Sequence, residues 1–172
     1  MRPWIIGLDV GSTTVKAVAM KRERDEVVWQ KYQRHEARQG ETVLNFLDQL
    51  DRELGASASN AQILVTGSGA GALAPLLGAR YVQEVNAVSL AAEKYCPEAQ
   101  SVVELGGQDA KMLFFESQPG GGRKKVAIMN DQCAGGTGAI LDKLAAKLQL
   151  HADGLCRQRY EGIALHPVAG KC

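Results

Sequence analysis

Residues 9–16 read Asp9-Val10-Gly11-Ser12-Thr13-Thr14-Val15-Lys16 and join two strand-like runs, 4–10 and 14–20. An acidic side chain at the end of a strand can hold hydrated Mg²⁺, and Gly11 lets the backbone bend toward an anion. The three hydroxyl residues offer O–H and N–H donors to phosphate oxygens, and Lys16 adds a point charge. A Walker A loop is excluded because it needs a following helix and a Gly-Lys-Ser/Thr ending. The segment predicts a phosphate-binding hairpin, with an ordinary Gly-Ser turn as the alternative.

Hydrophobic periodicity on either side of this hairpin predicts the same series of elements twice. A third strand at 27–32 is followed by a helix at 41–54, whose apolar face is expected to hold Val43, Leu44, Leu47, Leu50 and Leu54. A short strand at 63–66 and a helix at 85–95 follow. The pattern then restarts with strands at 101–105, 111–115 and 125–129 and a helix at 137–150. Two strand-strand-strand-helix series indicate a weak internal repeat.

The second series carries its own acid-glycine hairpin, Glu104-Leu105-Gly106-Gly107-Gln108-Asp109-Ala110-Lys111, and we expect residues 66–71 to be its companion. Two such hairpins in successive strand meanders resemble the pattern of the superfamily that includes actin, Hsp70 chaperones and sugar kinases. The resemblance implies an α/β chain with the actin-like ATPase (ribonuclease H-like) fold and a mixed sheet with helices. In that fold the two hairpins hold a nucleotide's phosphates from two sides. It also implies a first ATPase subdomain at 1–97 and the start of a second at 98–172.

Composition excludes some functions. The chain has 172 residues and a net charge of +1, which gives no broad electrostatic case for binding nucleic acid. The cluster Arg123-Lys124-Lys125 is expected at a solvated hairpin tip. No run reaches the roughly 18 apolar residues of a membrane helix, and the start lacks signal-peptide organisation. We therefore expect a cytoplasmic protein without a membrane partner. Its four cysteines are then expected to be metal ligands, catalytic groups or spectators rather than disulfides.

The segment Met129-Asn130-Asp131-Gln132-Cys133-Ala134-Gly135-Gly136-Thr137-Gly138 precedes the last predicted helix. A Cys133 thiolate is expected near the positive end of that helix. This segment, with residues 9–16 and 104–111, resembles the activator family of 2-hydroxyacyl-CoA dehydratases, whose relatives are the ATPase subunits of benzoyl-CoA reductase. The resemblance implies a homodimer that shares one [4Fe-4S] cluster, with Cys133 and Cys172 of each chain as ligands. It also implies ATP and Mg²⁺ as cofactors, a ferredoxin- or flavodoxin-type electron donor, and a dehydratase-like or reductase partner that receives a low-potential electron.

The same resemblance implies roles for individual residues. Asp9, Glu104 and Gln108 are expected to be catalytic, with the two carboxylates serving Mg²⁺ and water. Nucleotide contacts are expected from Gly11, Ser12, Thr13, Thr14, Lys16, Gly67, Gly106, Gly107 and Asp109. Glu104 departs from the family, which usually has Asp there, and its longer side chain changes the reach of the carboxylate. The family's adenosine-binding motif and the last helices of its second lobe come later in the chain, so we expect the second lobe to be incomplete and this sequence to be a fragment.

Other readings stay open. A sugar or small-molecule kinase of the same superfamily would need no iron, and a silent domain would keep the fold without turnover. Cys133 and Cys172 could instead be small buried residues. Cys96 and Cys156 are interpreted as spectators. His35, His151 and His166 lack ligand spacing with any cysteine and are not expected to bind metal.

Overall fold

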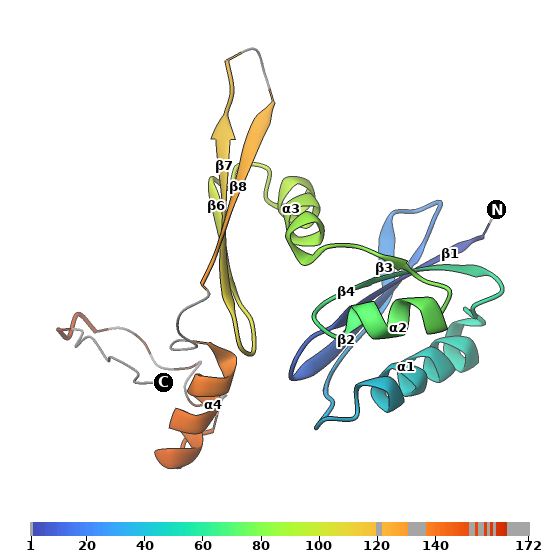
Figure 1. Ribbon diagram of the computed structural model, residues 1–172, viewed down its shortest axis with the longest axis horizontal. Helices are drawn as coiled ribbons and strands as arrows, with labels where there is room; N and C mark the ends of the chain where they lie inside the picture. The colour runs from blue at the N-terminus through green and yellow to red at the C-terminus, as the bar shows by residue number, and fades with distance from the viewer. Residues whose placement is uncertain are drawn as a thin grey trace. The chain divides into compact units, whose positions relative to one another are not determined.

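The computed structural model describes residues 2–119, 122–130, 137–151, 154, 157, 159 and 161–164. The chain forms two compact units, Met1–Pro97 and Glu98–Cys172 (Figure 1). Each unit is described by itself below. No helix in the described part is long and apolar enough to cross a membrane.

The first unit is built on a mixed five-stranded sheet with the order β3-β2-β1-β4-β5. Its strands are β1 Trp4–Val10, β2 Thr14–Lys21, β3 Glu26–Arg34, β4 Ala61–Thr66 and β5 Arg80–Tyr81. The first three form an antiparallel meander, while β4 pairs parallel with both β1 and β5. The helices are α1 Gln39–Leu54, α2 Ala70–Leu76 and α3 Glu84–Tyr95. Because β1 and β4 are parallel, the end of β1 at Asp9 and the end of β4 at Thr66 meet at one edge of the sheet.

Alternate residues of β1, β2 and β4 form the core against α1. Ile6, Leu8 and Val10 are buried from β1, and Phe46 of α1 is fully buried among them. The sequence pattern was wrong about one helix position, because Leu44 is 59% exposed while Phe46 is 0% exposed. The buried stripe follows Thr42, Val43, Phe46 and Leu50, a spacing that leaves Leu44 on the solvent side of the helix.

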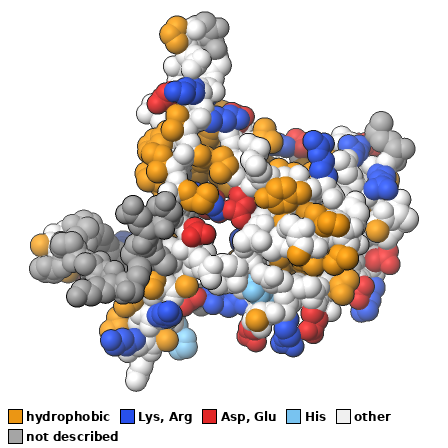
Figure 2. Space-filling model, viewed as in Figure 1, with side chains coloured by type: hydrophobic (Ala, Val, Ile, Leu, Met, Phe, Trp, Pro, Cys, Tyr) orange, Lys and Arg blue, Asp and Glu red, His pale blue; other side chains and the backbone are white. Residues whose placement is uncertain are grey.

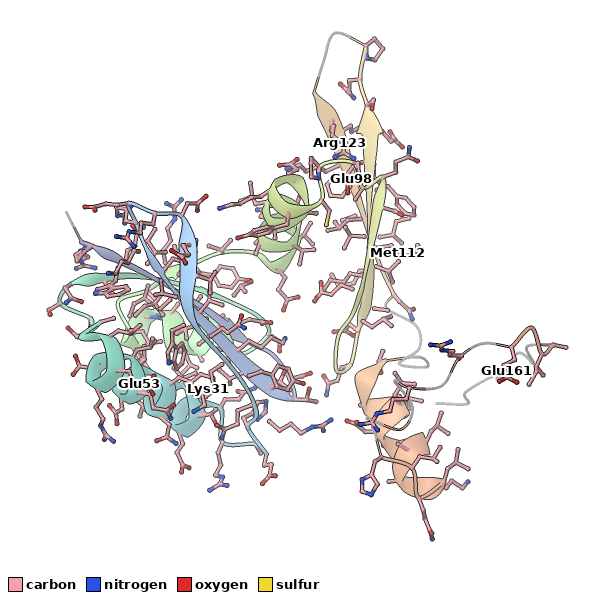
Figure 3. The ribbon with its side chains drawn as sticks, turned by 180° about the vertical axis from the view of Figure 1, so that it is seen from behind. Lys31, Glu53, Glu98, Met112, Arg123 and Glu161 are labelled. Atoms are coloured by element: carbon pink, nitrogen blue, oxygen red, sulfur yellow. The ribbon has the colours of Figure 1, made fainter. Side chains whose placement is uncertain are left out.

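Polar contacts add to this packing between α1 and β3. Trp29 Nε1 donates to Glu53 Oε2 at 2.8 Å, and Lys31 donates to Gln49. The Trp29 ring meets Phe46 edge-on, with 6.1 Å between centroids. Figure 3 labels Glu53 and Lys31 on these two elements. These contacts hold the C-terminal half of α1, which contains Gln49 and Glu53, against β3.

The second unit contains an antiparallel sheet, β6 Ser101–Leu105, β7 Ala110–Ser117 and β8 Arg123–Met129, followed by helix α4 Gly138–Lys147. Only Leu113 and Phe115 of this sheet are buried apolar residues. Its other face exposes apolar side chains that lie opposite one another across the strands, including Val103, Leu105, Met112 and Ile128. Figure 2 shows hydrophobic side chains gathered over β6–β8.

The predicted double series of three strands and a helix is confirmed by β1-β2-β3-α1 and β6-β7-β8-α4. Helix α2 was missed, because its Ala- and Gly-rich sequence has too few large apolar residues to show a helical period. Arg123, Lys124 and Lys125 belong to β8 rather than to a hairpin tip. Arg123 lies 4.7 Å from the centre of the Phe115 ring and donates to the carbonyl of Ala99 (Figure 3).

Candidate functional site

The β1–β2 hairpin places the predicted acid and lysine side by side. Asp9 pairs with Lys16 across the two strands, and Lys16 Nζ lies 2.6 Å from Asp9 Oδ2. Gly11 N donates to Thr14 O at 2.9 Å and closes the turn. Both charged side chains remain partly exposed, 34% for Asp9 and 47% for Lys16. An ion pair at this exposure contributes little to stability, so its groups are free to exchange partners with a bound anion and its metal ion.

The turn itself presents donors rather than acceptors. The peptide N–H groups of Ser12 and Thr13 bond to nothing in the described part of the chain, whereas the carbonyls of Gly11 and Thr13 accept bonds from behind the turn. Successive unpaired N–H groups in a tight turn form a concave site for an anion. The hydroxyls of Ser12 and Thr13 lie in the same turn. Thr14 differs from them because it is 7% exposed and faces inward.

Two side chains that the sequence did not single out hold this turn. His35 Nε2 lies 3.2 Å from Gly11 O, and Gln39 Nε2 donates to the same oxygen at 3.0 Å. The other ring nitrogen of His35 accepts from Ala37 N at 3.1 Å. Since Nδ1 accepts, Nε2 carries the proton and donates to Gly11. His35 is 5% exposed, and both ring nitrogens bond to backbone, so the ring positions the turn.

The turn after β4 also packs on the first hairpin. Gly69 N donates to Val10 O at 2.9 Å. Gly67 has φ +100°, and a Cβ at this position would lie 2.3 Å from Val10 O and 2.7 Å from Asp9 Oδ1. The residue must therefore be glycine. This places residues 66–71 beside the first hairpin, within the first unit, and their predicted pairing with the second hairpin stays a prediction. Thr66 Oγ1 is buried here without a hydrogen-bond partner in the described part.

The second hairpin repeats the strand pairing of the first at the same spacing, although its lysine is more buried. Glu104 pairs with Lys111 across β6 and β7, with Lys111 Nζ 3.5 Å from Glu104 Oε1. Gly106 N donates to Asp109 O at 2.8 Å, as Gly11 N does to Thr14 O. The N–H groups of Gly107 and Gln108 bond to nothing in the described residues, as do those of Ser12 and Thr13. The side chains of Gln108 and Asp109 are exposed at the turn.

Helix α4 begins on the second hairpin. Gly138 N donates to Gly106 O at 2.9 Å, and Ala139 N donates to Gly107 O at 3.0 Å. The next two N–H groups of the helix, those of Ile140 and Leu141, bond to Thr137 O. The first turn of α4 therefore has no free N–H group for a preceding thiolate, which leaves only the helix dipole for the predicted effect on Cys133. The contact does fix the start of α4 to the glycine turn.

The structure thus brings the predicted nucleotide residues together as two groups, one in each unit. Each hairpin combines turn N–H groups that are unpaired among the described residues with a partly exposed carboxylate and a lysine, and such groups fit the phosphates and Mg²⁺ of a nucleotide. Cys133 and Cys172, the predicted cluster ligands, lie outside the described residues. Within the described residues no group of three or more His, Cys, Asp or Glu side chains can hold a metal ion, and Cys96 is an exposed free thiol. Thiolates are the usual donors for iron–sulfur clusters, so the cysteines fit such a group by chemistry alone.

Comparison with known proteins identifies the family. Residues 6–157 match the family model of the BadF/BadG/BcrA/BcrD ATPases. The chain belongs to this ATPase family. The predicted resemblance to dehydratase activators is confirmed, because the 2-hydroxyisocaproyl-CoA dehydratase activator of Clostridioides difficile is 28% identical over 88% of this chain and 55% of its own length. An uncharacterized protein of Methanocaldococcus jannaschii is 30% identical over 93% of this chain and 62% of its own length.

A solved structure confirms the fold of this BadF/BadG/BcrA/BcrD-family chain. The crystal structure of the (R)-2-hydroxyglutaryl-CoA dehydratase component A from Acidaminococcus fermentans superimposes with a TM-score of 0.75 at 24% identity. It covers 91% of this chain and 60% of the solved chain. The predicted actin-like ATPase fold is therefore confirmed. This chain spans less than two thirds of the length of each of these relatives.

Proposed function

We propose that this chain is the phosphate-binding part of an ATP-dependent iron–sulfur activator. Such an activator delivers a low-potential electron to a 2-hydroxyacyl-CoA dehydratase or a related reductase. Membership of the ATPase family and similarity to the dehydratase activator of Clostridioides difficile support this assignment. When bound, ATP with Mg²⁺ supplies the hydrolysable phosphoanhydride and a [4Fe-4S] cluster supplies the electron.

The observation that carries the proposal is the contact between the second hairpin and α4. The carbonyls of Gly106 and Gly107 accept the first two N–H groups of the helix, and the segment with Cys133 leads directly into that helix. A displacement of the glycine turn therefore displaces the start of α4. In this way a change at the phosphates reaches the residue proposed to hold the cluster. A kinase of the same superfamily has no use for a cysteine at this position.

Each hairpin contributes the same set of roles. The N–H groups of Ser12, Thr13, Gly107 and Gln108 bind phosphate oxygens, and Lys16 and Lys111 balance their charge. Asp9 and Glu104 would hold the hydrated Mg²⁺ and orient the attacking water, and Gln108 is the third residue proposed for catalysis. Gly67 lets the β4 turn approach Asp9 closely. Cys133 and Cys172 from each of two chains complete four thiolate ligands, which requires a homodimer.

Anaerobic reconstitution with iron and sulfide tests the cluster. We expect about two iron atoms per chain, because one four-iron cluster is shared by two chains. Cys133→Ala is expected to remove the iron and the brown colour, while Cys96→Ala keeps both, since Cys96 is an exposed thiol in the first unit. If the wild-type protein were colourless and metal-free and phosphorylated a hydroxyl acceptor, the proposal would be wrong and a kinase function would be assigned instead. Wild-type iron content in Cys133→Ala would remove the cysteine assignment.

A further inference from the structure

A cluster of three arginines lies at the end of the first unit's sheet that is opposite to Asp9. Arg2, Arg22, Gln62, Ile63, Gly78 and Arg80 line a depression of about 550 Å³. Arg2 precedes β1 and Arg22 follows β2, so the depression begins where β1 starts, whereas Asp9 lies near the end of this strand. The seven residues of β1 separate the two places by about 20 Å at the usual rise of a strand. Figure 2 shows Lys and Arg side chains close to the N-terminus of the chain.

Two of the guanidinium groups are held in place by the backbone and an amide. Arg22 donates from Nε to Arg2 O at 3.0 Å and from Nη2 to Gln62 Oε1 at 2.5 Å. Arg2 donates from Nη1 to Ala61 O at 3.0 Å. A guanidinium carries five N–H donors, so most donors of both side chains remain unused. The bonds fix the direction of these groups without neutralising their charge, because every acceptor is uncharged.

No carboxylate of the described residues forms an ion pair with the three arginines. In the part of the chain that the structure describes, neither Arg2, Arg22 nor Arg80 forms an ion pair, and Arg80 makes no side-chain hydrogen bond. Three like charges around one depression repel one another, and an anion bound between them relieves that repulsion. Guanidinium forks match the paired oxygens of phosphate and carboxylate groups.

We infer that the Arg2–Arg22–Arg80 depression is a binding site for a small polyanion that carries phosphate or carboxylate oxygens. Its volume falls in the range of small-molecule sites. The site is separate from the proposed nucleotide site, because no residue of either hairpin lines it. Occupation is expected to stabilise the first unit and to weaken at high ionic strength, since the contacts are charge–charge interactions.

Side-chain NMR of the arginine Nε–Hε groups in the whole chain gives a direct test. Titration with pyrophosphate, and separately with citrate, is expected to shift the signals of Arg2, Arg22 and Arg80 in a saturable way while Arg52 on α1 stays unchanged. Shifts with pyrophosphate alone assign a phosphate ligand, shifts with citrate alone a carboxylate ligand, and shifts with both a general polyanion site. The absence of saturable shifts at the three arginines with either anion would overturn the inference.

Calorimetry on three variants separates this site from the phosphate hairpin. Arg80→Gln is expected to weaken binding of the effective anion roughly tenfold, because one charged contact is lost. Arg24→Gln is the matched control, since Arg24 is an exposed arginine near Arg22 that does not line the depression. In the NMR titration, Lys16→Gln is expected to leave the shifts of the three arginines unchanged. The same substitution is expected to weaken anion binding at the first hairpin. Equal affinities in Arg80→Gln and Arg24→Gln would contradict the assignment.

Discussion

Asp9 and Lys16 of the first hairpin correspond to Glu104 and Lys111 of the second, and each pair faces across its strands in the same register. The glycine that closes each turn, Gly11 or Gly106, also occupies the same place. Sequence alone pointed to both motifs, because acid, glycine and lysine recur at identical spacing. What the sequence could not show is that the turn N–H groups stay unpaired among the described residues, since this depends on whether acceptors from distant parts of the chain reach them.

Gly67 offers a test at the level of one residue. Gly67→Ala is expected to lower the free energy of unfolding by about 2 kcal/mol or more. The alanine would have to keep a positive φ of +100°, and its Cβ would lie 2.3 Å from the backbone oxygen of Val10. Gly71→Ala is the matched control, since a Cβ there meets nothing within 4 Å and lies on the exposed surface of α2. That change is expected to raise stability by up to about 1 kcal/mol. Urea unfolding of both variants measures the difference, and equal midpoints would show that the β4 turn does not pack on β1 as described.

The β3–α1 junction, an element-scale feature, holds the first phosphate turn from behind. Gln39→Leu keeps the size of the side chain but removes the donor to Gly11 O. We expect the Kd for ATP to rise about fivefold, the equivalent of one hydrogen bond worth about 1 kcal/mol, because the turn is held less firmly. Gln33→Leu, on the exposed side of β3, is the control. Calorimetric titration with Mg·ATP measures both, and an unchanged Kd for Gln39→Leu would make the bond structural only.

The hairpin between β2 and β3 is tied to α3 by an exposed ion pair. A hydrogen bond to the Asp25 carboxylate raises the pKa of Lys94 above its ordinary value of 10.5. A raised pKa means that the folded state binds the proton more tightly, so the stabilisation is complete below pH 10.5 and is lost as the pH rises through the folded-state pKa. Asp25→Asn removes the partner, and asparagine accepts the residue's φ of +50°.

We therefore expect the wild-type protein to be slightly more stable than Asp25→Asn at pH 8, and the difference between them to shrink at pH 11. Urea midpoints of the two proteins at both pH values check this. Taking the difference cancels the other groups that titrate in alkaline solution. A difference that stays constant between the two pH values would mean that the pair makes no pH-dependent contribution to stability.

The elements differ in how far their letters predicted them. Strands β1, β2 and β4 follow alternating or continuous apolar runs, and residues of these runs form much of the buried core. The start of α1 at Gln39, ahead of the predicted Glu41, was not visible, because it depends on the turn at His35 rather than on periodicity. His35 and Gln39 could have been found only as polar residues at the junction of a strand and a helix. Their common target, the Gly11 carbonyl, is set by tertiary structure.

At the scale of the whole molecule, the two hairpins belong to different units. The first unit has an extensive core of its own, whereas the described part of the second buries few apolar residues. We expect amide exchange to be slow in β1, β2 and β4 and faster in β8, which forms an edge of its sheet. The resemblance to the actin-like ATPases makes a further prediction, that one nucleotide contacts both turns.

Hydrogen exchange with mass spectrometry tests that prediction. If one Mg·ATP bridges the hairpins, its addition slows exchange at residues 11–14 and 106–109 together, because both sets of turn N–H groups then have phosphate partners. Lys16→Gln should remove the protection from both segments, although the substitution lies in the first unit alone, since weaker binding at one hairpin lowers occupancy at the other. The exposed Asp9–Lys16 pair contributes at most about 1 kcal/mol to folding, so the variant remains folded. Protection confined to residues 11–14, or protection at 106–109 that survives in Lys16→Gln, would show that the two hairpins do not share one nucleotide.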